Sequence, residues 1–158
     1  MRILIAAIGK MRGPEAALTD DYLKRARDLG RQRGFSGPDL SEFEAPRGLT
    51  GAARTEKEGD WLAGAAKDSV IIALDERGVN VSSEKIATML SDLRASGANG
   101  AAFLIGGADG HDRKVIAMAQ QTIAFGAATW PHMLVRTMLA EQLYRSMTIL
   151  AGHPYHRS

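Results

Sequence analysis

The sequence contains no cysteine, no long hydrophobic run and little net charge. Without cysteine, the chain has neither disulfides nor thiolate ligands for a metal. The apolar run at its start, within "MRILIAAIGK", covers six residues and has no cleavage site, so it predicts a first strand and not a signal peptide. No stretch approaches the roughly 18 apolar residues that a membrane span needs. We therefore expect a cytoplasmic protein.

The 158 residues include 45% hydrophobic and 24% charged residues, which is typical of a folded globular protein. At this length we expect a single domain over residues 1–158. A formal net charge of +2 is compatible with nucleic-acid binding but does not indicate it. Five cations do gather in residues 24–33, where they form either a solvated helix end or a phosphate-contacting patch. They are Lys24, Arg25, Arg27, Arg31 and Arg33.

Short apolar runs alternate with longer amphipathic ones along the chain. The pattern predicts an α/β fold, with a mostly parallel sheet and helices on both faces. The predicted strands are residues 2–7, 39–45, 69–75, 101–107 and 122–126. The predicted helices are residues 14–29, 55–66, 83–96, 112–119 and 133–150. Residues 30–39, rich in Gly and Arg, are predicted to form a loop.

The last predicted helix is the longest. Val135, Leu139, Leu143 and Met147 recur at every fourth position, which predicts one buried face. Gly152 follows as its stop signal.

Three predicted strands end in residues suited to a ligand site: Leu74 and Asp75, the pair Gly106–Gly107, and Phe125 with Gly126. In open parallel sheets, ligands bind outside the carboxyl ends of the strands. The stretch "LIGGADG" matches neither the dinucleotide fingerprint nor the phosphate P-loop. Its glycines are either plain turn residues or allow close backbone approach to an adenosine-like group.

The chain ends in "GHPYHRS", with two histidines spaced H-x-x-H. Two ligands without a third make a poor zinc site, so we expect no metal. The acids Asp75, Glu76 and Asp109 are candidate site residues, or simply solvated loop residues. From these features alone, the sequence indicates an α/β protein with a ligand crevice.

Three sequence blocks, which follow one another toward the C-terminus, indicate a family: "LIGGADG", "FGAATWPHMLVR" and "EQLYRSMTILAGHPYHR". They closely resemble the ribosomal large-subunit RNA methyltransferase H family of the SPOUT superfamily, and the resemblance spans the chain apart from residues 27–50. It implies a C-terminal trefoil knot, a homodimer and S-adenosylmethionine as cofactor. It also implies methylation of N3 of a pseudouridine in 23S rRNA, near the decoding region of assembled ribosomes. The alternatives are a SPOUT enzyme acting on another RNA, such as tRNA, and a non-catalytic ribosome-binding module.

The resemblance also implies site residues. The cofactor would be bound by Leu74, Gly106, Phe125, Gly126, Ala127, Ala128, Thr129 and Trp130. Trp130 departs from the smaller residue usual there, so we expect only its backbone to contribute, with its ring filling the core beside Pro131.

The candidate catalytic residues are Arg145, His153, Tyr155, His156 and Arg157. The arginines would stabilise a developing anion, the histidines would accept a proton, and the tyrosine would stack on a base. Glu141 is an alternative base. Arg136 and Arg145 are alternatively ion-pair partners at an interface, and His132 is expected to be structural.

Overall fold

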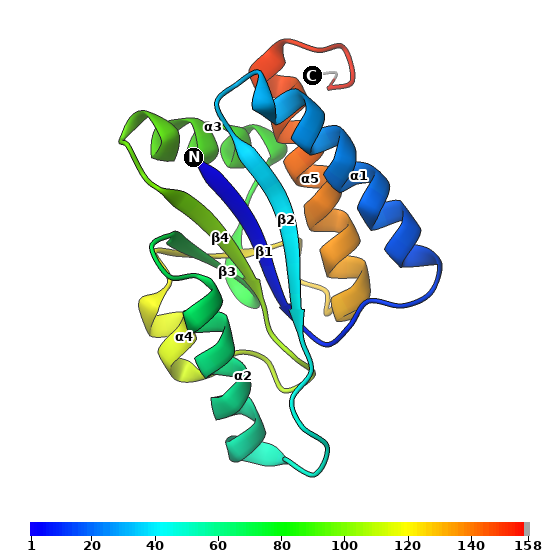
Figure 1. The fold of residues 1–158 in the computed structure, drawn as a ribbon, viewed down its shortest axis with the longest axis vertical. Helices are drawn as coiled ribbons and strands as arrows, with labels where there is room; N and C mark the ends of the chain where they lie inside the picture. Colours follow the sequence, from blue (N-terminus) through cyan, green and yellow to red (C-terminus); the bar gives the residue numbers. More distant parts are fainter. Residues whose placement is uncertain (157–158) are drawn as a thin grey trace.

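The structure, a computed structural model, describes residues 1–156 and is built on one five-stranded sheet (Figure 1). Every strand pairing is parallel, in the order β2-β1-β4-β3-β5. The strands are β1 (Arg2–Ile8), β2 (Ser36–Phe43), β3 (Val70–Asn80), β4 (Gly100–Ile105) and β5 (Gln121–Ala124). The helices are α1 (Pro14–Arg31), α2 (Gly51–Ala65), α3 (Ser83–Ala95), α4 (Arg113–Met118) and α5 (His132–Ala151). The predicted α/β class is confirmed.

Helices cover both faces of the sheet. Alternate residues of β1 point to opposite sides: Ile3 and Ile5 join the core under α1, α3 and α5, while Leu4 and Ala6 join the core under α2 and α4 (Figure 1). A parallel strand buried on both faces reads as a continuous apolar run, which explains why β1 and β4 were recognisable in the sequence. None of the helices in residues 1–156 combines the length and apolarity of a membrane crossing.

Two strand boundaries differ from the prediction by three residues or more. The expected loop over residues 30–39 is wrong in its last part, because β2 begins at Ser36, where it pairs with Arg2 of β1. Pairing with β1 at the edge of the sheet outweighs the Gly and Pro content, and an edge strand tolerates proline. Strand β3 continues to Asn80, since its second half pairs with β5 after a shift in register.

Helix α5 agrees with its predicted pattern. Leu139, Leu143 and Met147 are fully buried, and Val135 packs against the same core. Gly152 ends the helix in the left-handed conformation, with φ of 65°, which a glycine adopts without steric cost.

A buried ion pair fastens the start of α5 to the sheet. The Arg136 side chain is fully buried, and its guanidinium donates to Glu42 at 2.7 Å and to the carbonyl of Ile8. Glu42 also accepts from the backbone N–H of Met11 at 2.8 Å. Burial lowers the pKa of Arg136, and the Glu42 charge opposes that shift. The interface alternative for Arg136 is therefore wrong: its partner lies within the same chain.

We predict that Glu42→Gln lowers the free energy of unfolding by about 3 kcal/mol, because it leaves a buried guanidinium without its counter-charge. Chemical denaturation measures this loss. Glu44→Gln is the matched control, since the Arg12–Glu44 pair is exposed and 3.7 Å long, and it should change stability little. Equal losses in the two variants would contradict the structural role of the buried pair.

Candidate active site

A cavity of about 570 Å³ opens at the carboxyl ends of β3, β4 and β5. This is the edge at which the sequence predicted a ligand site, and the volume lies within the range of small-molecule pockets. His132, expected to be structural, also lies on its wall. The lining consists of residues 74–77, 105–111, 123–126, 128–132 and Val135.

The glycines after β4 shape the cavity by close backbone packing. A Cβ at Gly106 would lie 2.8 Å from the carbonyl carbon and oxygen of Gly110. Gly107 and Gly110 form an antiparallel bridge, and a Cβ at Gly107 would lie 2.8 Å from a carboxylate oxygen of Glu58. Both interpretations of these glycines from the sequence therefore apply: the glycines form a tight turn, and the backbone of that turn lines the cavity.

His111 is a cavity residue that the sequence analysis did not single out. Its Nε2 lies 3.0 Å from the carbonyl oxygen of Leu74, so Nε2 carries the ring proton and donates it. Burial lowers the pKa of His111, which keeps the ring neutral near pH 7. The sequence could have indicated His111 as a site residue through its position just after the glycine turn that follows a buried strand.

The loop over residues 125–131 is held by the second half of β3. The backbone N–H of Gly126 donates to Asn80 Oδ1 at 2.9 Å, and the Thr129 hydroxyl donates to Glu76 Oε2 at 2.9 Å. The extension of β3 beyond Asp75 thus supplies both anchors of the loop.

Trp130 does not fill the core, so that expectation is wrong. Its side chain is 44% exposed. The indole N–H donates to the carbonyl of Phe125 at 3.0 Å and closes the loop on itself. This hydrogen bond within the loop satisfies the polar end of the ring without burying it.

Seven of the eight residues expected to bind the cofactor lie on the cavity wall, and the eighth, Ala127, does not. The seven are Leu74, Gly106, Phe125, Gly126, Ala128, Thr129 and Trp130.

The chain end packs against its own helices. The Tyr155 hydroxyl lies 3.1 Å from Glu141 Oε1, and its ring packs 4.7 Å from the Tyr144 ring between centroids. The Arg145 guanidinium lies 4.8 Å from the centre of the Tyr155 ring. We call Glu141, Arg145 and Tyr155 the tail cluster.

Two histidines complete the chain end that the structure describes. His156 Nε2 lies 2.9 Å from Glu84 in the first turn of α3. His153 Nδ1 accepts from the backbone N–H of Tyr155 at 3.2 Å. Arg157 lies outside the described residues. Within residues 1–156, no three His, Asp or Glu side chains gather as metal ligands.

The protonation state of Tyr155 follows from its surroundings. Burial, with Tyr22 and Glu141 nearby, raises the pKa of Tyr155 to about 12. The phenol is therefore neutral at physiological pH and donates a hydrogen bond. It suits stacking and hydrogen bonding but not proton abstraction.

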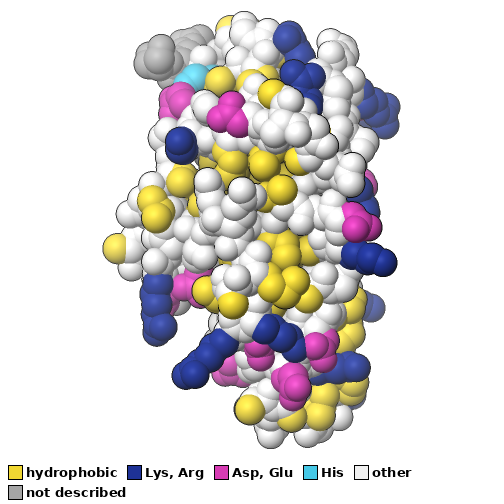
Figure 2. Space-filling model, turned by 90° about the vertical axis from the view of Figure 1, so that its left-hand side faces the viewer, with side chains coloured by type: hydrophobic (Ala, Val, Ile, Leu, Met, Phe, Trp, Pro, Cys, Tyr) yellow, Lys and Arg dark blue, Asp and Glu magenta, His cyan; other side chains and the backbone are white. Residues whose placement is uncertain are grey.

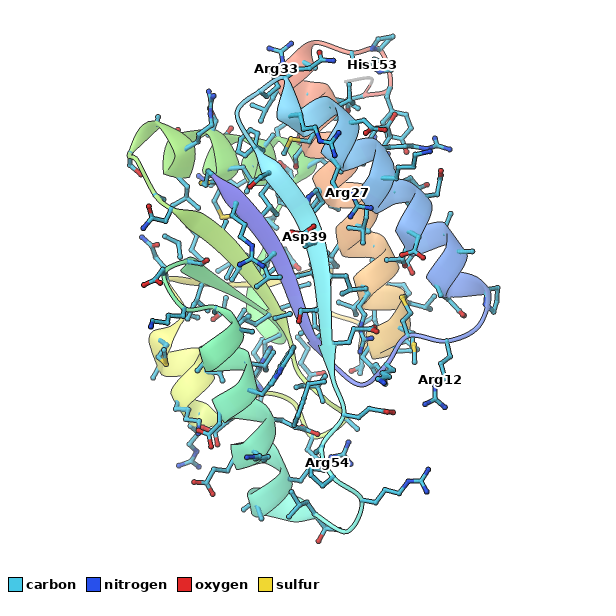
Figure 3. All side chains as sticks on the ribbon, viewed as in Figure 1. Arg12, Arg27, Arg33, Asp39, Arg54 and His153 are labelled. Atoms are coloured by element: carbon cyan, nitrogen blue, oxygen red, sulfur yellow. The ribbon has the colours of Figure 1, made fainter. Side chains whose placement is uncertain are left out.

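One chain does not bring the cavity and the tail cluster together. Helix α5 begins at His132 on the cavity wall and ends at Ala151, beside the tail. His132 and Arg145 are thirteen residues apart, about 20 Å along a helix axis. Figure 1 shows that α5 ends on the side opposite to the carboxyl ends of the strands, and His153 lies there in Figure 3.

The basic segment 24–33 is partly engaged by the chain itself. Arg25 pairs with Asp21 at 2.7 Å, and Arg27 donates to the carbonyl of Pro38 at 2.9 Å. Arg33 donates to the carbonyl of Ala151, which places it beside the tail (Figure 3). Three of the five cations therefore stabilise local structure, whether or not a phosphate also binds there.

We predict that Gly106→Ala lowers the free energy of unfolding by about 1–3 kcal/mol, because the added methyl meets the backbone of Gly110. Gly64→Ala in α2 is the control, since a Cβ there meets nothing within 4 Å and alanine favours a helix. Denaturant unfolding should show a loss for the first variant and none for the second. A Gly106→Ala protein as stable as the control would contradict the packing described above.

Comparisons with known proteins agree with this architecture. A family model described as "Predicted SPOUT methyltransferase" matches residues 1–156. Two solved structures share the fold: a probable methyltransferase from Bordetella pertussis and a probable methylase family protein from Haemophilus influenzae. The first has a TM-score of 0.55 and 13% identity, and covers 92% of this chain and 96% of that one. The second has a TM-score of 0.55 and 11% identity, and covers 99% of this chain and 70% of that one.

Curated relatives are much more similar in sequence. A protein of Hyphomonas neptunium named "Ribosomal RNA large subunit methyltransferase H" is 49% identical, and the match covers 100% of both chains. One of the same name from Chelativorans is 48% identical over 99% of this chain and 91% of its own. With these matches over nearly its whole length, the chain belongs to the SPOUT methyltransferase family, in the group of the large-subunit methyltransferase H proteins.

Proposed function

We propose that this protein transfers a methyl group from S-adenosylmethionine to N3 of a pseudouridine in 23S rRNA, near the decoding region of assembled ribosomes. The observation that carries the proposal is full-length identity of 48–49% to relatives named as large-subunit rRNA methyltransferases. The acceptor nucleotide follows from the motif resemblance. A ribosomal substrate also places the protein in the cytoplasm.

The cavity suits S-adenosylmethionine. Leu74, Ile123 and Phe125 offer apolar surface for an adenine ring, while the glycine turn and the loop over residues 125–131 leave backbone groups within reach of polar atoms. When bound, the cofactor supplies an electrophilic methyl group on a sulfonium.

The protein's own contribution is to orient the acceptor and stabilise its anion. The methyl group would pass from the sulfonium to N3, with S-adenosylhomocysteine as the other product. N3 begins protonated, so it must lose a proton at or before transfer. We assign the cation beside the developing anion to Arg145, supported by Arg157, and the proton acceptor to one of the imidazoles His153 and His156.

A homodimer would bring together the cavity and the tail cluster, which lie apart within one chain. The cavity of one subunit would be completed by the tail cluster of the second, because α5 holds them apart within one chain. A groove of about 290 Å³ runs from Phe125 at the cavity to Glu141 in the tail cluster, and Leu18 and Tyr22 of α1 line it. We propose that the second copy packs along this groove.

Exposed apolar side chains support such an association. Figure 2 draws the face on the left-hand side of Figure 1, where hydrophobic side chains gather along the middle and charged side chains lie mostly around the rim. Apolar surface of this kind often marks an interface. The large exposed hydrophobic residues are Leu18, Val79, Ile116, Met118, Trp130 and Leu134.

We further propose that the C-terminal part of residues 1–158 forms the trefoil knot of a single SPOUT domain. The course of the chain supports this, since it leaves β5 at one edge of the sheet and returns through α5 to pack against α1. The loop over residues 106–112 would be the one that the chain threads.

We predict that protein incubated with methyl-labelled S-adenosylmethionine labels assembled ribosomes but not free large-subunit rRNA or tRNA. Mass mapping of the labelled nucleoside should give N3-methylpseudouridine. Arg145→Ala, which removes the proposed cation, should label ribosomes on the order of a hundredfold more slowly. Equal labelling of tRNA would instead indicate another RNA substrate, and no labelling of any RNA would indicate a non-catalytic ribosome-binding module.

A further inference from the structure

Glu141 accepts more hydrogen bonds than any other group in the tail cluster. Its Oε1 accepts from Arg145 Nε at 2.9 Å and from the Tyr155 hydroxyl at 3.1 Å. Its Oε2 accepts from the Gln142 amide at 2.8 Å. The side chain is only 17% exposed. Because its oxygens are already engaged by three donors, Glu141 is poorly placed to take a proton from a substrate.

The same carboxylate sets the relative position of two candidate catalytic groups. Arg145 lies one helical turn after Glu141, whereas Tyr155 comes from the segment beyond the helix stop at Gly152. Both meet at Oε1, which places the guanidinium 4.8 Å from the Tyr155 ring centre. The hydrogen bond to Glu141 also raises the pKa of Arg145, so the arginine keeps its charge.

A second set of contacts fixes Glu141 itself. Gln142, which donates to Glu141, accepts from the Ser83 hydroxyl at 2.7 Å at the start of α3. The next residue of α3, Glu84, holds His156 at 2.9 Å. The tail is thus anchored on α5 and on α3, and Glu141 and Gln142 link these two anchors.

We infer that Glu141 is a positioning residue for methyl transfer. It orients Arg145 and Tyr155 as one unit toward the acceptor base, and it neither touches the base nor removes its proton. The inference rests on the proposed function, because it assigns a role to Glu141 in that same reaction. It also excludes Glu141 as the alternative base considered from the sequence.

The test is the rate of methyl transfer to assembled ribosomes by Glu141→Gln and Glu141→Asp. Glutamine keeps the shape but loses the charge, and aspartate keeps the charge but no longer reaches Tyr155 from the same backbone position. Each should lower kcat on the order of a hundredfold, the usual cost of misplacing reacting groups by about 1 Å. The KM for S-adenosylmethionine and the shape of the pH–rate profile should not change.

A mutant cycle separates positioning from a direct role. If Glu141 acts only through Arg145 and Tyr155, adding Glu141→Gln to the double variant Arg145→Ala/Tyr155→Phe should slow transfer no further. Asp60→Asn is the control, since it breaks the Lys114–Asp60 ion pair between α4 and α2, which lie on the face of the sheet opposite to α5. It should leave kcat unchanged.

Hydrogen exchange gives a readout that does not depend on activity. The amides of His153, Tyr155 and His156 should exchange faster in Glu141→Gln than in wild type or Asp60→Asn. The inference would be overturned if both Glu141 variants transferred the methyl group at the wild-type rate. It would also be overturned if their pH–rate profile lost one limb, or if they no longer bound the cofactor. If the wild-type protein labelled no RNA, the proposed function would fail together with the inference. If the wild-type protein labelled ribosomes and the Glu141 variants were fully active, only the inference would be overturned.

Discussion

The arrangement of the whole site depends on one continuous helix. Helix α5 starts on the wall of the cavity at His132 and carries Arg145 of the tail cluster thirteen residues later, a separation of about 20 Å. In the proposed homodimer, the tail cluster of the second subunit would complete the cavity of the first.

Both ends of α5 are fastened in ways that keep this geometry. At its start, the buried pair of Arg136 and Glu42 ties the helix to the carboxyl ends of β1 and β2, beside the loop that borders the cavity. At its end, Gly152 turns the chain so that Tyr155 folds back onto Glu141. The cavity loop is in turn anchored on Glu76 and Asn80 of β3. These contacts fix α5 and the cavity loop relative to the sheet.

The hydrophobic pattern of the sequence predicted those strands and helices whose own residues determine where they are buried. The buried strands β1 and β4 were recognisable as continuous apolar runs, and the buried face of α5 was recognisable from its apolar residues at every fourth position. The start of β2 and the end of β3 were not, because both are set by pairing with strands distant in sequence. The same reason hid His111 and the link from Glu141 to Tyr155. The ring of Trp130 was expected to fill the core beside Pro131, yet its N–H pairs within an exposed loop. The order of the motifs, rather than their periodicity, indicated the family.

Subunit complementation tests the shared site most directly. A variant with a blocked cavity, Ala128→Trp, and a variant lacking residues 153–158 should each be inactive alone. Mixed dimers place an intact cavity opposite an intact tail, so a randomly assorted equal mixture should regain about a quarter of wild-type methyl transfer. A mixture that stays inactive, although mass measurement shows that mixed dimers have formed, would contradict the shared site. So would full activity of the tail-deleted variant alone.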